Sequence, residues 1–276
     1  MRKWIKAALS GLSVLGITAG GVVTGHAQDF DGETVNVGVA SDIEEEVWQI
    51  VADKADEEGI TLDITLFTDY IQPNEALANG SIDLNAFQHV AYLNEWNEAN
   101  EGNLVPLGFT YVTSLGLYSD KVDAVEDLEK GATIAIPNDP TNGGRALLAL
   151  QQAELLTVDE AAGILPTVED IKDNPLDLQF EEIDAAQLAT VLPDVDAVFI
   201  NNNFAIDAGL SIDEAIFRDG EDVEALKDDY KNVVAVKEDR KDEELLKHIL
   251  SLYQTEEVED KITELSDGGD VAAWEK

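Results

Sequence analysis

Short β-rich runs alternate with helical patterns along most of this chain. In residues 43–58, apolar side chains recur at spacings of three and four, which predicts a helix with one buried face. The neighbouring segments are rich in β-branched residues and bounded by turn residues, as is typical of strands. The first third of the chain is therefore predicted to hold strands at 34–40, 61–67 and 82–87 and helices at 43–58, 73–79 and 89–100. This β-α-β-α-β order indicates a parallel sheet with helices on both faces.

The rhythm changes in residues 104–118, where apolar strands follow one another without long helices between them. A second α/β unit begins at residue 133. It is predicted to hold strands at 133–137, 178–183 and 197–201 and helices at 142–155 and 185–191. The C-terminal part is predicted to add a strand at 233–237 and helices at 242–253 and 255–265.

Two α/β units without a Gly/Ser linker between them favour a hinge over a flexible tether. We therefore expect an α/β fold of two lobes, with mixed sheets, helices on both faces of each sheet and a ligand cleft between the lobes. Lobe 1 is expected to comprise residues 28–117 plus 232–276, and lobe 2 residues 118–231.

The N-terminal segment is typical of an export signal. Arg2, Lys3 and Lys6 precede a run of small and apolar residues, and residues 25–27 (GHA) offer a small-x-small cleavage site. We expect residues 1–27 to be a signal peptide and the protein to work outside the cytoplasm. Retention of this segment as a membrane anchor is the alternative.

The chain has 17 Lys and Arg against 58 Asp and Glu, a net charge of -41. Nucleic acids and anionic lipid surfaces would be repelled by such a charge at long range. The acidic residues are spread along the chain, which favours a solubility surface over a binding tail. The absence of Cys excludes disulfides and thiolate chemistry.

Aromatic side chains and a rare histidine gather in residues 67–93, where a strand meets a helix. Tyr70, Phe87, His89 and Tyr92 lie in this segment, and His89 is one of only two histidines beyond residue 27. Such a cluster at the end of a strand favours a ligand cage over an ordinary core.

Residues 136–147 (IPNDPTNGGRAL) offer an anion site. The strand runs into turn residues, Thr141 or Asn142 can cap the following helix, and Arg145 lies in its first turn. The free N–H groups of a helix start and a guanidinium both bind carboxylates, and Gly143 and Gly144 would let a ligand approach the backbone. Pairing of Arg145 with a nearby acid of the protein is the alternative.

A third candidate lies at residues 197–208 (AVFINNNFAIDA), where a strand ends in three asparagines and a helix begins. Ligands of open α/β sheets bind at the carboxyl ends of strands. The amide of Asn201 can both donate and accept, which suits a zwitterion. Helix capping is the simpler alternative, although one Asn would be enough for it.

Other chemistry has little support. The chain has no G-x-S-x-G, G-x-G-x-x-G or phosphate-binding loop, and His89 and His248 lack metal-ligand spacing. No metal or cofactor is therefore expected. An enzyme that uses scattered carboxylates and a surface interaction or adhesion protein are the alternatives to a ligand-binding protein.

Several long motifs occur together and in order: DYIQPNEALANGSIDLNAFQHVAYL, LPTVEDIKDNP, DDYKNVVAVKED and the two segments just described. In these the chain resembles the methionine-binding (NlpA-type) lipoproteins of ABC importers, from about residue 35 to residue 274. The resemblance implies a periplasmic-binding-protein-like fold of type II, which closes over an amino acid. It also implies L-methionine or a relative such as D-methionine or a methionine dipeptide as ligand. The implied partners are a membrane permease and its cytoplasmic ATPase, with the binding protein itself a monomer.

By the same resemblance, Tyr70, Phe87, His89 and Tyr92 match positions that line the thioether pocket. Arg145 matches the position that holds the ligand carboxylate, and Asn201 and Asn232 those at its polar end. The chain departs from the family at Gly20, which stands where the lipid-accepting Cys is expected. It also departs at residues 41–44 (SDIE) and 113–114 (TS), where family members carry Gly-, Pro- or His-containing turns.

Overall fold

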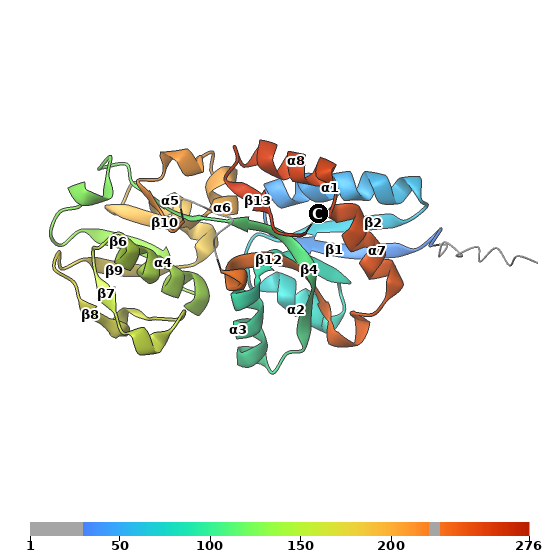
Figure 1. The fold of residues 1–276 in the computed structure, drawn as a ribbon, viewed down its shortest axis with the longest axis horizontal. Coiled ribbons are helices and arrows are strands. Elements are labelled where there is room, and N and C mark those ends of the chain that lie inside the picture. Colours follow the sequence, from blue (N-terminus) through green and yellow to red (C-terminus); the bar gives the residue numbers. More distant parts are fainter. Residues whose placement is uncertain (1–29, 221–226, 276) are drawn as a thin grey trace, which may run out of the picture.

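The computed structural model describes residues 30–220 and 227–275. Their strands form two main sheets in two lobes that lie side by side (Figure 1). The predicted two-lobed α/β fold is confirmed. The predicted signal peptide lies outside the described residues. Within the described ranges, no helix is both long enough and apolar enough to cross a membrane.

The first sheet has six strands in the order β13-β4-β12-β3-β1-β2. Its strands are β1 (Thr34–Val39), β2 (Thr61–Leu66), β3 (Leu84–His89), β4 (Leu104–Thr113), β12 (Lys231–Lys237) and β13 (Asp270–Ala272). Strand β1 pairs in parallel with both of its neighbours, β2 and β3, as the alternating pattern predicts. The pairs that involve β12 and β13 are antiparallel, so the sheet is mixed.

Helices cover both faces of this sheet. One face carries α1 (Asp42–Glu57), α7 (Glu244–Tyr253) and α8 (Glu256–Leu265), and the other carries α2 (Gln72–Asn79) and α3 (Val90–Asn100). Trp48 of α1 is fully buried and lies 5.0 Å from the ring of Tyr253 in α7. Leu77 of α2 and Leu93 of α3 fill the opposite core.

The second sheet has the order β11-β5-β10-β6-β9. Its strands are β5 (Leu115–Tyr118), β6 (Thr133–Pro137), β9 (Gln179–Ile183), β10 (Ala197–Asn201) and β11 (Phe217–Arg218). Its faces are covered by α4 (Pro140–Gln152) on one side and by α5 (Leu188–Val191) and α6 (Asn202–Asp207) on the other. A small separate sheet pairs β7 (Thr157–Val158) with β8 (Ile171–Asp173).

Ser114 alone separates β4 of the first sheet from β5 of the second. The two strands form one long ribbon that bridges the lobes in Figure 1. The chain returns to the first sheet at β12, which follows the 3₁₀ turn at Asp228–Tyr230. The lobe boundaries at residues 117/118 and 231/232 stay a prediction.

Some element bounds differ from the predictions. The third strand is shifted two residues along and ends at His89, whose side chain then caps α3 by accepting the Tyr92 N–H. Helix α4 begins at Pro140, and its cap is Asp139 instead of Thr141 or Asn142, because the Asp139 carboxylate accepts the Asn142 N–H at 2.8 Å. The strands β7, β8, β11 and β13 were not predicted. Each has only two or three residues, which is too short to show an alternation of apolar and polar side chains.

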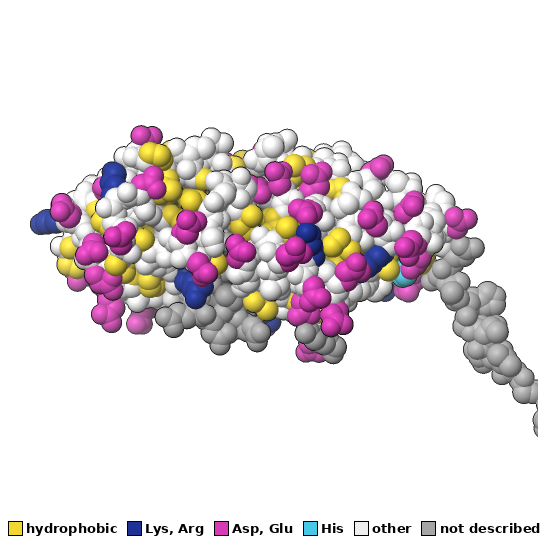
Figure 2. Space-filling view, turned by 90° about the horizontal axis from the view of Figure 1, so that it is seen from above, with side chains coloured by type: hydrophobic (Ala, Val, Ile, Leu, Met, Phe, Trp, Pro, Cys, Tyr) yellow, Lys and Arg dark blue, Asp and Glu magenta, His cyan; other side chains and the backbone are white. Residues whose placement is uncertain are grey.

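Acidic side chains are spread over the face shown in Figure 2, with few basic ones between them. On that face they do not gather into a single patch. This distribution agrees with the interpretation of the acidic composition as a solubility surface.

Candidate ligand-binding site

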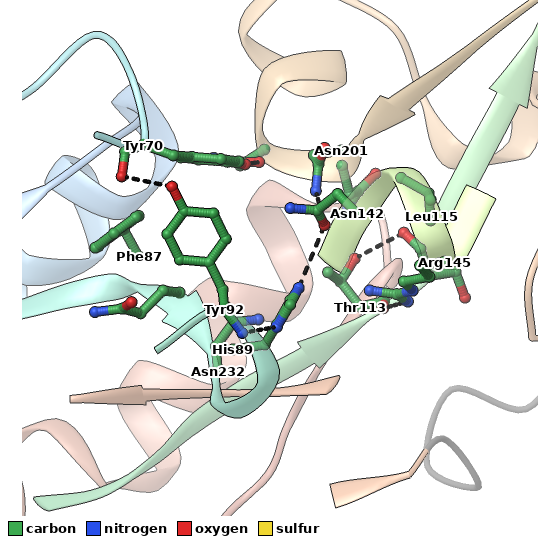
Figure 3. A pocket seen from close by; sticks show the side chains of 14 residues that line it. Tyr70, Phe87, His89, Tyr92, Thr113, Leu115, Asn142, Arg145, Asn201 and Asn232 are labelled. Carbon is green, nitrogen blue, oxygen red and sulfur yellow. Dashed lines mark hydrogen bonds between the residues drawn. The ribbon is translucent and has the colours of Figure 1, made fainter. Parts of the chain in front are cut away.

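A cavity with about 410 Å³ of empty space lies between the lobes. All seven residues predicted for the site line it: Tyr70, Phe87, His89, Tyr92, Arg145, Asn201 and Asn232. Figure 3 shows how they face one another across the cavity. The structure therefore brings the predicted residues together, and their role in ligand binding stays a prediction.

Aromatic rings form one wall of the cavity. Tyr70 lies in the loop after β2, Phe87 on β3 and Tyr92 on α3, with ring centroids 5.6–6.0 Å apart. Tyr70 also stacks on Phe204 of α6 at 4.7 Å, so the wall reaches the second lobe. The Tyr92 hydroxyl donates to the Tyr70 carbonyl at 3.0 Å and fixes the Tyr70 loop (Figure 3). Such a wall is apolar and polarisable.

His89 is buried and neutral. Its Nδ1 accepts the Tyr92 N–H at 3.1 Å, so the ring proton must reside on Nε2, which lies 3.3 Å from the Asn142 amide oxygen. Burial and, to a smaller extent, the charge of Arg145 lower the pKa of His89 to about 3. A neutral ring with both nitrogens engaged is a wall residue and not a free base.

The amide of Asn142 connects the two lobes. Its nitrogen donates to the Asp139 carboxylate, so its oxygen must point the other way. That oxygen receives the His89 Nε2–H from the first lobe and the Asn201 amide N–H, at 3.0 Å, from the second (Figure 3). Asp139 thereby determines the orientation of the Asn142 amide and, through it, that of the Asn201 amide.

Arg145 is 2% exposed and is held from two sides. Its Nε lies 2.5 Å from the Asp219 carboxylate, and its Nη2 donates to the Thr113 carbonyl at 2.7 Å. The guanidinium also lies 4.5 Å from the ring centroid of Tyr230. Its Nη1 makes no hydrogen bond within the part of the chain that the structure describes. The guanidinium therefore has a protein partner, as the alternative interpretation foresaw, and still keeps one donor edge for an anion.

The two glycines before Arg145 have a packing role that differs from the predicted one. A Cβ on Gly143 would lie 2.6 Å from the Pro137 carbonyl oxygen. A Cβ on Gly144 would lie 3.1 Å from the backbone at Ile164 and Leu165. These glycines let α4 approach neighbouring protein backbone, and the expected ligand approach at this point is not supported.

Three buried amide atoms of consecutive asparagines have no hydrogen-bond partner among the described residues. They are the oxygens of Asn201 and Asn202 and the nitrogen of Asn203. All three side chains line the cavity. The other end of each amide is paired: Asn201 with Asn142, Asn202 with Asp270 at 2.7 Å, and Asn203 with the Tyr70 hydroxyl at 2.6 Å. An unpaired buried polar atom is costly, so these atoms indicate where a bound molecule is needed.

Asn232 lies opposite His89 across the antiparallel pair of β12 and β3. Its side chain is 5% exposed and makes no hydrogen bond with the described residues. Because neighbouring side chains on paired strands project to the same face, Asn232 and His89 reach the cavity together.

Further lining residues were missed by the predictions: Gln88, Asn142, Asn202, Asn203 and 113–115. Asn202 and Asn203 belong to the predicted Asn run, which could have identified them. Gln88 belongs to a buried network with Asn74 and Asn85, in which each amide is paired, and the sequence gives no sign of it.

Two carboxyl groups are buried close to this site, around a second cavity lined by Tyr111 and Tyr253. Glu44 of α1 accepts the Ala40 N–H at 2.8 Å and the Tyr111 hydroxyl at 2.7 Å. Burial raises the pKa of Glu44 to about 7 and that of Asp270 to about 6. The Asp270 carboxylate is the one that Asn202 meets, so this pair adjoins the ligand cavity.

The NlpA lipoprotein family profile matches residues 35–274. Lipoprotein 28 of Escherichia coli O157:H7 is 37% identical over 94% of this chain and 95% of its own length. The D-methionine-binding lipoprotein MetQ of Escherichia coli strain K12 is 37% identical over 91% and 93% of the two chains. A solved nutrient binding protein from Burkholderia cenocepacia, bound to methionine, is 39% identical and has a TM-score of 0.82, covering 87% of this chain and all of its own. Sequence and fold agree over nearly the whole described chain, which therefore belongs to the NlpA lipoprotein family.

Proposed function

We propose that this protein is the substrate-binding component of an ABC importer and that it binds L-methionine in the cavity between its lobes. The relatives support the class and the ligand, since one is named a D-methionine-binding lipoprotein and a solved neighbour holds methionine. The chain belongs to a family of transport binding proteins, not of enzymes.

The observation that carries the proposal is the division of the cavity into two halves. Tyr70, Phe87 and Tyr92 form an apolar half, which suits a polarisable thioether. Arg145 and the Asn side chains form a polar half, which suits a charged amino-acid backbone. A free amino acid with an uncharged, flexible side chain matches both halves at once.

The site also explains why His89 belongs to a binding pocket. In its neutral form it adds no charge beside the thioether, and its ring edge packs against Tyr92 and Tyr230 at 6.3 and 5.9 Å. The buried ring supplies shape and one hydrogen bond to Asn142. This is the role expected of a wall residue in a specific pocket.

The transport partners follow from the family. We propose that the protein works outside the cytoplasm as a monomer and delivers its ligand to a membrane permease driven by a cytoplasmic ATPase. Closure of two lobes around a ligand changes the surface that both lobes present, which is the signal such a permease can read.

Isothermal titration of the purified protein with L-methionine tests the proposal. We expect saturable binding at one site, and weaker binding of methionine sulfoxide, because a polar sulfoxide would lose solvation against the aromatic wall. Norleucine, which replaces the sulfur by a methylene, is the matched control for the thioether and should bind more weakly than methionine. If no amino acid or methionine dipeptide produces binding heat, the proposal is wrong.

A further inference from the structure

Asn202 has one end of its amide fixed and the other end free. The residue follows β10 directly and is 1% exposed. Its nitrogen donates to the Asp270 carboxylate at 2.7 Å, across from the second lobe to the first. Its oxygen has no hydrogen-bond donor among the described residues, although the side chain lines the ligand cavity.

The orientation of this amide is determined by Asp270. An ionised carboxylate only accepts hydrogen bonds, so the amide must turn its nitrogen toward Asp270 and its oxygen away. Asp270 is itself held in place, because its N–H donates to the Ser266 hydroxyl at 2.9 Å. Gly269 completes the packing, since a Cβ there would lie 3.2 Å from the Asn202 nitrogen. The free oxygen is therefore preset as an acceptor.

Asn201 repeats this arrangement through a different acid. Asp139 orients Asn142, which takes the Asn201 nitrogen and leaves the Asn201 oxygen unpaired. Two adjacent residues thus present buried acceptors at one cavity. Acceptors that are held in place by carboxylates favour a cationic donor. Such a donor makes a hydrogen bond to the amide oxygen and is also attracted by the negative charge of the carboxylate. The Nη1 of Arg145, for which the described part of the chain offers no acceptor, marks where a ligand's negative group would lie.

We infer that the Asn202 oxygen accepts a hydrogen bond from the α-ammonium group of the bound amino acid, with Asp270 as the residue that positions it. The inference rests on the proposed function and adds how the ligand's positive end is recognised. A carboxylic acid with the same side chain but no α-ammonium group would leave this acceptor unpaired. The site therefore selects amino acids against their deaminated analogues.

The test compares two ligands on one variant. Affinities for L-methionine and for 4-(methylsulfanyl)butanoate, which lacks only the ammonium, are measured by titration for wild type and for Asn202→Leu. A hydrogen bond to a charged group contributes about 1.5–3 kcal/mol, so methionine should bind roughly 10- to 100-fold more weakly to the variant. The butanoate should bind to both proteins with the same affinity. Asn94→Leu, an exposed position on α3, is the matched control and should change neither value.

Equal weakening of both ligands by Asn202→Leu would overturn the inference, because the residue would then act only on the shape of the pocket. A wild-type protein that binds neither ligand would instead reject the proposed function. Thermal melting of the variant establishes that it folds. If it does not fold, Asp270→Asn decides the question. Without the charge of Asp270 the Asn202 amide is free to turn. Methionine should therefore bind more weakly to this variant, while the affinity for the butanoate should not change. An unchanged preference for methionine over the butanoate would overturn the inference.

Discussion

The Tyr70 hydroxyl donates to the Asn203 amide oxygen at 2.6 Å and joins the first lobe to the second. The same tyrosine ring stacks on Phe204, one residue further along α6. Beyond this contact lies an open groove between the lobes, lined on its two sides by Phe67 and Ala189 among others. Tyr70 therefore stands between the ligand cavity and the groove, and lobe opening must break its contacts.

Replacement of Tyr70 by Phe should speed ligand release. The variant keeps the ring stack but removes the one hydrogen-bond partner that the Asn203 amide has within residues 30–220 and 227–275, at a cost of about 1–2 kcal/mol in the closed form alone. We expect ligand dissociation to be roughly 5- to 30-fold faster, with little change in the association rate. Stopped-flow fluorescence measures both rates.

Tyr118→Phe is the control for this substitution. The Tyr118 hydroxyl is buried without a partner among the described residues, and it lies in the second sheet away from the cavity. Its removal should leave both rates unchanged and should not lower stability. If Tyr70→Phe also leaves dissociation unchanged, the Tyr70–Asn203 bond does not hold the lobes closed.

Asp219→Asn should destabilise the ligand-free protein and enlarge the stabilisation by ligand. Without the carboxylate, the buried Arg145 guanidinium has no ion-pair partner among the described residues, which costs about 3–5 kcal/mol. A ligand carboxylate at Nη1 would restore part of that charge balance. Melting temperatures with and without methionine should therefore differ more than in wild type.

Glu46→Gln is the matched control, because it removes an exposed carboxylate that pairs with Lys261. Such a pair contributes at most about 1 kcal/mol, and the shift caused by ligand should equal that of wild type. An equal shift for Asp219→Asn would mean that Arg145 does not meet the ligand carboxylate.

Glu44→Gln should raise stability above neutral pH. The pKa of Glu44 is about 7 in the folded protein, against an ordinary value of 4.5, so the folded state binds the proton more tightly than the unfolded chain. The contribution of the protonated carboxyl to the free energy of unfolding is complete below pH 4.5. It is lost as the pH rises through 7, and the loss is on the order of 3 kcal/mol. The glutamine can still accept from Ala40 and donate to Tyr111, so it avoids this loss.

Denaturant unfolding at pH 5 and pH 8 measures the effect of Glu44→Gln. The variant should be more stable than wild type at pH 8 and similar to it at pH 5. Glu45→Gln, at the next and exposed position of α1, should match wild type at both values. If the stability of wild type and of Glu44→Gln depended on pH in the same way, burial would not raise the pKa of Glu44.

His89 should remain unprotonated throughout the range from pH 5 to pH 8. Its folded pKa of about 3 lies below the ordinary value of 6.5, so the unfolded chain takes up a proton first as the pH falls. This residue's contribution to stability is complete above pH 6.5 and is lost toward pH 3. The ¹⁵N resonances of its ring should show a protonated Nε2 and a bare Nδ1, and a titration midpoint near 6.5 would contradict the structure.

Gly143→Ala should lower stability although alanine favours helices. The added methyl would meet the Pro137 carbonyl oxygen at 2.6 Å, and such overpacking costs about 1–3 kcal/mol. Gly144→Ala meets its neighbours at 3.1 Å and should cost less. Denaturant unfolding ranks the two variants, and an equal or stabilising effect of Gly143→Ala would contradict the close approach of α4 to the strand before it.

The sequence was sufficient to predict those parts of the site that lie at the ends of regular elements. Tyr70, Phe87 and His89 end or follow strands of a strongly periodic segment, and Arg145 lies in the second turn of a helix after another strand. The carboxyl ends of parallel strands meet at one edge, so local pattern alone places such residues together.

Features that depend on distant partners could not be predicted in this way. Asn202 appears in the sequence as one of three equal asparagines, and only Asp270, 68 residues away, determines which end of its amide is free. Arg145 likewise meets Asp219, 74 residues further on. In a chain with 58 acidic residues, spacing does not reveal which carboxylate a given side chain will meet.

The single-residue junction between β4 and β5 connects the backbone of the two lobes directly beside the cavity. Arg145 holds the Thr113 carbonyl on one side of Ser114, and Asp219, its ion partner, holds the Leu115 N–H on the other at 2.8 Å. Arg145 and Asp219 therefore hold the backbone on both sides of the residue that joins the two sheets. We therefore expect the angle between the lobes to depend on how the Arg145 guanidinium is paired.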